Sequence, residues 1–224
     1  MNKTNYPQIE DMFSREDQQK NSFDIRAFNS IYTILPGVFS PKVRNNSLWY
    51  TEKVLELLKG NSFLEIGAGV GILAIEVAKQ GYQVVATDID PQAIKNIQLN
   101  SDKHKIPIDV REGDIFEPLK REERFDTIFW NHPWIYSEEK IDSRHQVSFD
   151  YHYQALKKFM SEGKHYVKKD GQILLGTGSL ARIGLITTWA HDFGYKIKLI
   201  CREVQPLAVG GETLAEFFIY SLSS

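Results

Sequence analysis

Residues 65–71 read EIGAGVG, which places three glycines at alternate positions shortly after an acidic residue. Glycine has no Cβ atom, so a loop of this composition turns tightly and lets its backbone approach a bound ligand. The pattern is not the GxGxxG loop that binds the pyrophosphate of a dinucleotide, because position 72 is Ile and Glu65 would repel phosphate. A carboxylate at this place favours a ligand with a positively charged end.

Two further acidic residues follow at the ends of predicted strands. Asp88 lies 21 positions after Gly67, which is the spacing of a carboxylate that accepts hydrogen bonds from ribose hydroxyls. Asp114 follows the next predicted strand, and we expect its carboxylate to reach an adenine amino group while Ile115 lies against the ring. A cationic group, a ribose and an adenine together describe S-adenosylmethionine, whose ammonium and sulfonium groups would face Glu65.

Residues 61–135 resemble a class I S-adenosylmethionine-dependent methyltransferase. In that family, the equivalents of Gly67, Gly69, Asp88 and Asp114 hold the cofactor. The resemblance therefore implies an enzyme that uses S-adenosylmethionine. The expected cofactor-binding residues are Glu65, Gly67, Ala68, Gly69, Gly71, Asp88, Ile89, Asp114, Ile115 and Asn131.

The tetrapeptide Asn131-His132-Pro133-Trp134 follows the fourth predicted strand and should lie beside the cofactor. It resembles the (Asn/Asp)-Pro-Pro-(Tyr/Phe/Trp) motif of methyltransferases that act on planar nitrogen. Such a nitrogen is a poor nucleophile because its lone pair is delocalised, so two carbonyl groups accept its N–H hydrogens and fix it in line with the methyl group. We predict four catalytic residues: Asn131 as the side-chain acceptor, the carbonyl of His132 as the backbone acceptor, Pro133, and Trp134 as a stacking face.

His132 departs from this motif, which usually has proline at that place. Pro133 still favours an extended conformation at residue 132, and the backbone carbonyl is unchanged. His132 could act as a proton acceptor, since its unperturbed pKa lies near neutrality, or it could simply fill the loop surface. Trp134 likewise could be a core or rim aromatic residue instead of a stacking face. The motif therefore leaves the acceptor open.

Residues 36–41, Pro-Gly-Val-Phe-Ser-Pro, predict a turn-rich loop. It is similar to the Gly-Val-Phe-Ser loop of the small methyltransferase domain group, which includes ribosomal RNA guanine methyltransferases and glutamine methyltransferases of release factors. In that group the loop closes over the cofactor site, so Phe39 and Trp134 are the expected substrate-binding residues. The substrate domains of both branches are too large for the first 60 residues, so acceptor recognition should use the short N-terminal segment and the loops.

The resemblance favours N-methylation of a planar nitrogen, with a protein glutamine side chain as the first choice of acceptor. The alternatives are a base of rRNA or tRNA, a small molecule, or a non-catalytic protein that only binds S-adenosylmethionine. A nicotinamide-dependent dehydrogenase is a rival of another class. The formal net charge of −2 counts against a chain built to hold long nucleic acid by charge alone.

The elements that must position these residues follow from the hydrophobic pattern. Five strands are predicted, at residues 62–66, 83–88, 106–111, 125–131 and 172–176. Helices are predicted at residues 47–59, 71–80, 91–101, 151–167 and 179–193, the last with Ser179 as its N-cap. Two more strands, at 195–202 and 214–222, follow each other without a helix and should pair antiparallel. We expect an α/β fold with a doubly wound, mainly parallel, Rossmann-like sheet of seven strands, an antiparallel last strand and helices on both faces. Residues 1–46 should form an N-terminal arm and cap segment, and residues 47–224 the methyltransferase domain.

Other features restrict the compartment and the partners. The single cysteine, Cys201, cannot form an intramolecular disulfide, and no apolar run approaches the roughly 18–20 residues of a membrane span. We expect a cytoplasmic protein without a membrane partner. His145 and His152, with acidic residues nearby at 142 and 150, match no standard metal-binding spacing, so no metal is expected. The mixed-charge run at 120–124 is interpreted as a solvated loop.

Overall fold

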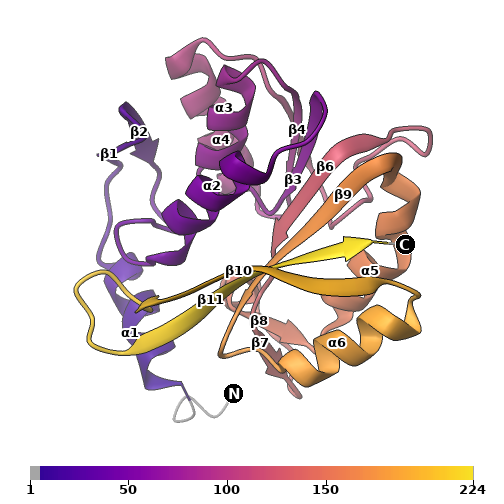
Figure 1. Ribbon diagram of the computed structural model, residues 1–224. Coiled ribbons are helices and arrows are strands. Elements are labelled where there is room, and N and C mark those ends of the chain that lie inside the picture. Colours follow the sequence, from indigo (N-terminus) through magenta and orange to yellow (C-terminus); the bar gives the residue numbers. More distant parts are fainter. Residues whose placement is uncertain (1–5, 224) are drawn as a thin grey trace.

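The computed structural model describes residues 6–223, and a seven-stranded sheet forms its centre (Figure 1). The strand order is β10-β11-β9-β6-β3-β4-β5, and β11 runs antiparallel to both of its neighbours. The strands are β3 (Ser62–Ile66), β4 (Gln83–Asp88), β5 (Asp109–Glu112), β6 (Phe125–Asn131), β9 (Val167–Gly178), β10 (Lys196–Pro206) and β11 (Leu214–Ser223). The predicted fold class, with parallel inner strands and an antiparallel last strand, is confirmed.

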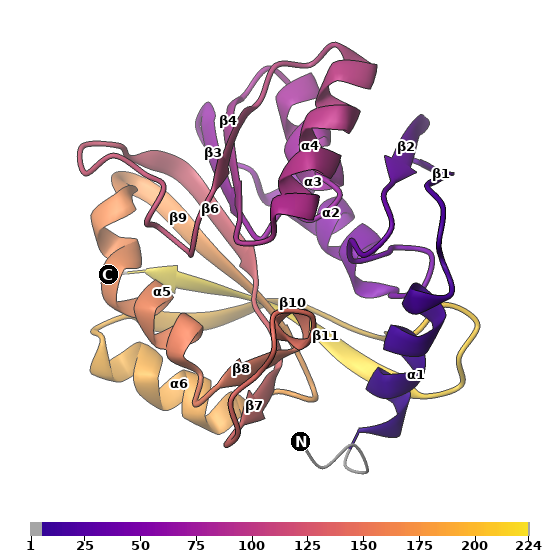
Figure 2. The ribbon, with the colours of Figure 1, turned by 180° about the vertical axis from the view of Figure 1, so that it is seen from behind.

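Helices cover both faces of this sheet (Figures 1 and 2). One layer holds α2 (Asn46–Leu57), α3 (Ile72–Lys79) and α4 (Pro91–His104), and the other holds α5 (Gln154–Tyr166) and α6 (Ile183–Asp192). Neighbouring side chains of a strand point to opposite faces, so Phe63 belongs to the apolar core that contains Val54 and Val77, while Leu64 belongs to the one that contains Phe159 and Ile186. A strand buried on both faces has no polar side to alternate with, which explains the continuous apolar runs in the sequence.

The N-terminal segment contains α1 (Pro7–Asp17) and a hairpin of β1 (Phe23–Ala27) and β2 (Ser30–Ile34). This region packs on the main domain, because Tyr32 and Ile34 are fully buried. The side chain of Asn100 also binds the backbone of Thr33 on both sides, accepting from its N–H at 2.8 Å and donating to its carbonyl at 2.9 Å. The hairpin is thereby fixed against α4.

Two predicted helix starts were wrong because neighbouring residues pair as strands instead. A helix was predicted from Tyr151, but that residue belongs to β8 (Phe149–Tyr151), which pairs in parallel with β7 (Ile135–Ser137), and α5 begins only at Gln154. Ser179 was predicted to cap α6. Its backbone N–H instead donates to the carbonyl of Glu216 in β11 at 2.9 Å, and α6 begins four residues later.

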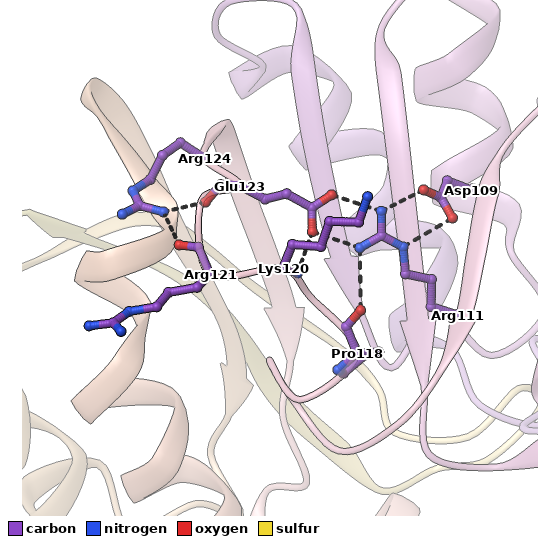
Figure 3. A network of polar contacts seen from close by, with 7 residues as sticks. All are labelled: Asp109, Arg111, Pro118, Lys120, Arg121, Glu123 and Arg124. Atoms are coloured by element: carbon purple, nitrogen blue, oxygen red, sulfur yellow. Dashed lines mark hydrogen bonds and ion pairs between the residues drawn. The ribbon is translucent and has the colours of Figure 1, made fainter.

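The mixed-charge run at 120–124 is tied to the edge strand β5 by a polar network (Figure 3). The guanidinium of Arg111 donates to the carboxylate of Glu123 at 2.7 Å and to that of Asp109 at 2.6 Å. Glu123 also accepts the backbone N–H of Lys120 at 2.6 Å. These contacts fix the loop between β5 and β6.

The described part of the chain contains no helix that is long and apolar enough to cross a bilayer. A short 3₁₀ helix, η2 (His145–Val147), precedes β8.

Candidate active site

The glycine-rich loop follows β3 at the carboxyl edge of the parallel strands, where doubly wound sheets bind ligands. Gly69 has a φ of +57°, in the left-handed region that other residues adopt at a cost, and a Cβ atom built on it would meet open space. Gly71, with a φ of +82°, opens α3, and a Cβ atom there would lie 3.0 Å from Ile97. The loop therefore shapes a cradle whose surface at Gly69 is bare backbone.

Asp88 stands at the end of β4 and holds this loop. One oxygen of its carboxylate accepts the backbone N–H of Gly69 at 2.9 Å, and the other accepts that of Asp90 at 3.0 Å. Burial raises the pKa of Asp88 to about 6, although the two N–H donors oppose the shift. The predicted pair of glycine loop and strand-end carboxylate is thus in direct contact.

Glu65 is buried, with 7% of its surface exposed. Among residues 6–223, its Oε2 atom finds no hydrogen-bond partner. Burial raises its pKa to about 8, and the nearby charge of Asp88 adds to the shift, while the backbone N–H of Ala74 opposes it. A buried carboxyl without a counter-charge is costly when ionised, so a ligand with a cationic group would fit this position. The orphaned oxygen and the bare backbone at Gly69 both suit S-adenosylmethionine.

Asp114 and Ile115 follow β5, and the structure gives them different surroundings. The carboxylate of Asp114 forms an ion pair with Lys158 of α5 at 2.8 Å and is about one-third exposed. Ile115 has a φ of +53° and is buried in the core under α5. The backbone N–H of Gly113 donates to the carbonyl of Asp88 at 2.9 Å, which joins this loop to the end of β4. Ile89, also predicted at the cofactor, is 53% exposed.

Asn131 ends β6 beside the glycine loop, because Trp130 is paired with Ile66, the last residue of β3. Its side-chain oxygen accepts the indole N–H of Trp134 at 3.1 Å. Trp134 is 6% exposed and packs edge-on against Tyr50. Its carbonyl accepts the hydroxyl of Tyr153. Most of the Trp134 ring therefore belongs to the aromatic core, as one of the two sequence interpretations expected.

His132 is not on the loop surface, and that interpretation was wrong, because only 1% of its surface is exposed. Strand β9 lies beside β6, so the imidazole Nε2 of His132 meets the hydroxyl of Thr177 at 2.8 Å, and its backbone N–H donates to Gly176 at 3.3 Å. Burial lowers the pKa of His132 to about 3. The imidazole is therefore neutral near pH 7, and His132 is a weak base in this position.

Three residues of the tetrapeptide line one pocket, and Asn131 alone of the predicted cofactor residues lies in its wall. Asn131, His132 and Trp134 form its inner wall, and Phe39 of the predicted loop joins them from the N-terminal segment. Its central cavity measures about 30 Å³, which is room for one or two water molecules. Sequence reasoning missed the outer wall, whose members carry no motif: Ile9, Met12, Arg44, Asn46 and Leu180. Their spacing along the chain gives no signal, because only the fold brings them together.

The two histidines considered for metal binding form hydrogen bonds with other side chains. His145 pairs with the carboxylate of Asp142 at 2.7 Å, and His152 shares a hydrogen bond with the hydroxyl of Tyr136 at 2.7 Å. Asp150 accepts the backbone N–H of Leu156 at 3.0 Å in the first turn of α5. No group of three or more acidic, histidine or cysteine side chains within residues 6–223 is arranged to hold a metal ion.

Comparison with known proteins shows similarity to several methyltransferases. Over 173 residues the chain is 30% identical to a Methanocaldococcus jannaschii protein named provisionally as an N5-glutamine methyltransferase, covering 75% of this chain and 85% of the relative. It is 33% identical over 106 residues to the release factor glutamine methyltransferase of Geobacter sulfurreducens, covering 46% of this chain and 37% of that protein. The T. thermophilus 16S rRNA guanine methyltransferase, solved with AdoMet and guanosine, superimposes with a TM-score of 0.66 at 21% identity, over 91% of this chain and 50% of that chain.

The family model named "Methyltransferase small domain" matches residues 29–182, a stretch that runs from the β1–β2 hairpin to the start of α6. That stretch contains the glycine loop, both strand-end carboxylates and the tetrapeptide after β6. The match extends over more than half of the chain and agrees with the sheet order and with the pocket chemistry. The protein therefore belongs to the methyltransferase small domain family and is an S-adenosylmethionine-dependent methyltransferase.

Proposed function

We propose that this enzyme methylates a planar nitrogen and that its acceptor is a glutamine side chain of a protein. The observation that carries the proposal is the position of Asn131 and His132, which lie at the carboxyl end of β6 beside the glycine loop and line the pocket. The M. jannaschii relative, whose name specifies glutamine, supports the choice of acceptor. The net charge of −2 favours a protein over a long nucleic acid.

We assign the cofactor to the loop of Gly67, Gly69 and Gly71 together with Glu65 and Asp88. Glu65 would face the cationic amino acid end, where its unpaired oxygen would gain a partner. Asp88 would accept hydrogen bonds from the ribose, using the lone pairs that its backbone donors leave free. S-adenosylmethionine supplies the methyl group on a sulfonium and leaves as S-adenosylhomocysteine.

Asp114 and Ile115 would bind the adenine on the far side of Asp88. The ion pair of Asp114 with Lys158 leaves one carboxylate oxygen available for an amino group. The contact between Gly113 and the carbonyl of Asp88 holds the two loops in a fixed relation. Ala68 and Ile89 complete the proposed cofactor contacts.

The acceptor amide would lie between Asn131 and the carbonyl of His132. Each would accept one N–H, so the nitrogen lone pair is turned toward the methyl group and becomes more nucleophilic. As the new N–C bond forms, one N–H proton leaves the nitrogen, and the product is an N-methyl amide. With its low pKa, His132 would act as a neutral hydrogen-bonding group, and the proton would pass to solvent. Trp134 would fix Asn131 through its indole N–H and offer one edge to the acceptor.

The test is methyl transfer from labelled S-adenosylmethionine to a cell extract, with the modified product identified by mass. We expect label on a protein glutamine with the wild type and a loss of about 10²–10³-fold with Asn131→Ala. The matched control is Asn61→Ala, on an exposed loop. Equal labelling by wild type and Asn131→Ala contradicts the role of Asn131. Label on RNA or on a small molecule contradicts the glutamine acceptor, and cofactor binding without labelling contradicts catalysis.

A further inference from the structure

Helix α1 forms the outer wall of the acceptor pocket. Ile9 and Met12 line the same pocket as Asn131 and His132, and they are only 3% and 2% exposed. Both views place α1 beside the ends of β10 and β11, apart from the helices that cover the sheet (Figures 1 and 2). The position is fixed there by Arg15, which donates to the carbonyl of Val209 at 2.9 Å. This wall is therefore separate from the sheet that carries the catalytic residues.

A single buried arginine connects α1 to the pocket. Arg44, 5% exposed, binds both carboxylate oxygens of Glu16 in α1, at 2.9 and 3.1 Å. Its third contact is with the hydroxyl of Ser148, at 2.7 Å. The guanidinium also lies over the rings of Phe13 and Phe39, at 4.7 and 4.9 Å from their centroids. A two-pronged arginine–carboxylate pair of this kind is strong and directional, and it neutralises the charged side chains nearest the pocket.

The pocket is narrow in this arrangement, with a cavity of about 30 Å³. Two of its lining residues also carry buried polar atoms that lack a hydrogen-bond partner within residues 6–223, the Oδ1 of Asn46 and the Nδ1 of His132. Buried polar groups are normally paired. An amide that entered here would supply both donors and acceptors.

We propose that α1 is the acceptor-recognition element of this methyltransferase. The Glu16–Arg44 pair opens to admit the acceptor, and Ile9 and Met12 then close over the aliphatic part of its side chain. The central strands cannot separate without breaking the sheet, whereas α1 lies outside the sheet and contributes two of the residues that line the pocket. The proposal rests on the function proposed above and adds to it the residues that select the acceptor.

The first experiment fills or enlarges the pocket from α1. We expect Met12→Trp to reduce methyl transfer into cell extract at least tenfold, while the dissociation constant for S-adenosylhomocysteine, measured by calorimetry, changes less than twofold. Met12→Ala should raise the extract concentration needed for half-maximal labelling, with the maximal rate nearly unchanged. Ser14→Trp, on the exposed side of α1, is the control and should label like the wild type.

Three results would overturn the proposal. In the first, the wild type is active and both Met12 variants give as much labelled product as Ser14→Trp, which would show that α1 does not face the acceptor. Equal loss of labelling and of cofactor binding in Met12→Trp would show a general structural defect. A wild type that binds cofactor and labels nothing would overturn the function proposed above together with this one.

The second experiment tests the Glu16–Arg44 pair, which we call the latch, in the absence of an acceptor. Glu16→Gln weakens the pair with Arg44, and we expect backbone amides of α1 to exchange hydrogen at least fivefold faster than in the wild type. Glu10→Gln, the same change on the same helix but outside the Glu16–Arg44 pair, should leave exchange within twofold. Unchanged exchange in Glu16→Gln would contradict the assignment of this pair as the latch.

Discussion

Trp134 donates its indole N–H to the side-chain oxygen of Asn131 at 3.1 Å, so the two ends of the tetrapeptide after β6 hold each other. The indole is itself fixed by the surrounding aromatic core, where its ring lies 5.5 Å from that of Phe217. A rigid core residue thus sets the direction in which the catalytic amide points. Because a misplaced acceptor group lowers reactivity steeply, this bond has a measurable consequence.

We predict that Trp134→Phe lowers the rate of methyl transfer about tenfold at saturating cofactor, since the ring is kept and only the N–H is lost. The affinity for S-adenosylhomocysteine should stay within twofold. Trp49→Phe is the matched control, because Trp49 also donates an indole N–H, to Glu203, outside the pocket. Initial rates of labelling and calorimetry check both variants. Equal rates for the two variants would mean that the bond to Asn131 does not orient the amide.

We predict that Glu65 releases a proton when the cofactor binds. Its pKa is raised to about 8 by burial, so the free enzyme holds a proton on Glu65 below that pH. A cationic ligand favours the ionised carboxylate, and affinity should rise about tenfold per pH unit below pH 8. Calorimetry of S-adenosylmethionine at pH 6, 7 and 8 in two buffers with different ionisation enthalpies measures the release. It should disappear in Glu65→Gln and persist in Glu112→Gln, a control at an exposed position of β5.

The same raised pKa has a consequence for the stability of the free enzyme. Glu65 titrates near its ordinary value of 4.5 in the unfolded chain and at about 8 in the folded one. Its contribution to stability is therefore complete below pH 4.5 and is lost as the pH rises through 8. Urea unfolding of the free enzyme should show a smaller loss of stability between pH 6 and pH 8 in Glu65→Gln than in the wild type.

For His132 we predict the opposite dependence of folding stability on pH. Burial lowers its pKa from 6.5 to about 3, so the unfolded chain binds a proton that the folded chain rejects when the pH falls below 6.5. Its contribution is complete above pH 6.5 and is lost as the pH falls toward 3; between pH 7 and 5 this amounts to roughly 2 kcal/mol. Urea unfolding of His132→Asn should lack this loss. His191→Asn, at an exposed position of α6, should retain it.

We predict that Gly69→Ala weakens cofactor binding by more than its effect on folding stability explains. An alanine there adopts a left-handed φ at a cost of about 1 kcal/mol, and its Cβ atom would enter the open space of the cradle. Gly210→Ala is the control, because Gly210 has a φ of +71° and open space as well. Melting temperatures should fall alike in the two variants. Only Gly69→Ala should weaken S-adenosylhomocysteine binding, by at least tenfold; equal affinities would place the cofactor away from this loop.

The positions of the central strands could be predicted from the sequence. β3, β4 and β6 begin and end where the apolar runs do, because each run is short and bounded by turn residues. The pairing of the glycine loop with Asp88 also followed from spacing, since consecutive parallel strands bring their carboxyl ends to one edge. The start of α5 could not be predicted, because β7 and β8 pair across a gap that no local pattern marks.

The sequence by itself determined the class of sheet, the glycine loop and the tetrapeptide, because periodicity and spacing are local properties of the chain. Only the tertiary structure decided the state of His132, whose imidazole contacts Thr177 of a neighbouring strand and whose pKa is lowered by burial. It also decided the outer wall of the pocket, where Arg44 joins Glu16 to Ser148 across more than 100 residues of chain. Such contacts follow from packing between distant segments, and no spacing in the sequence encodes them.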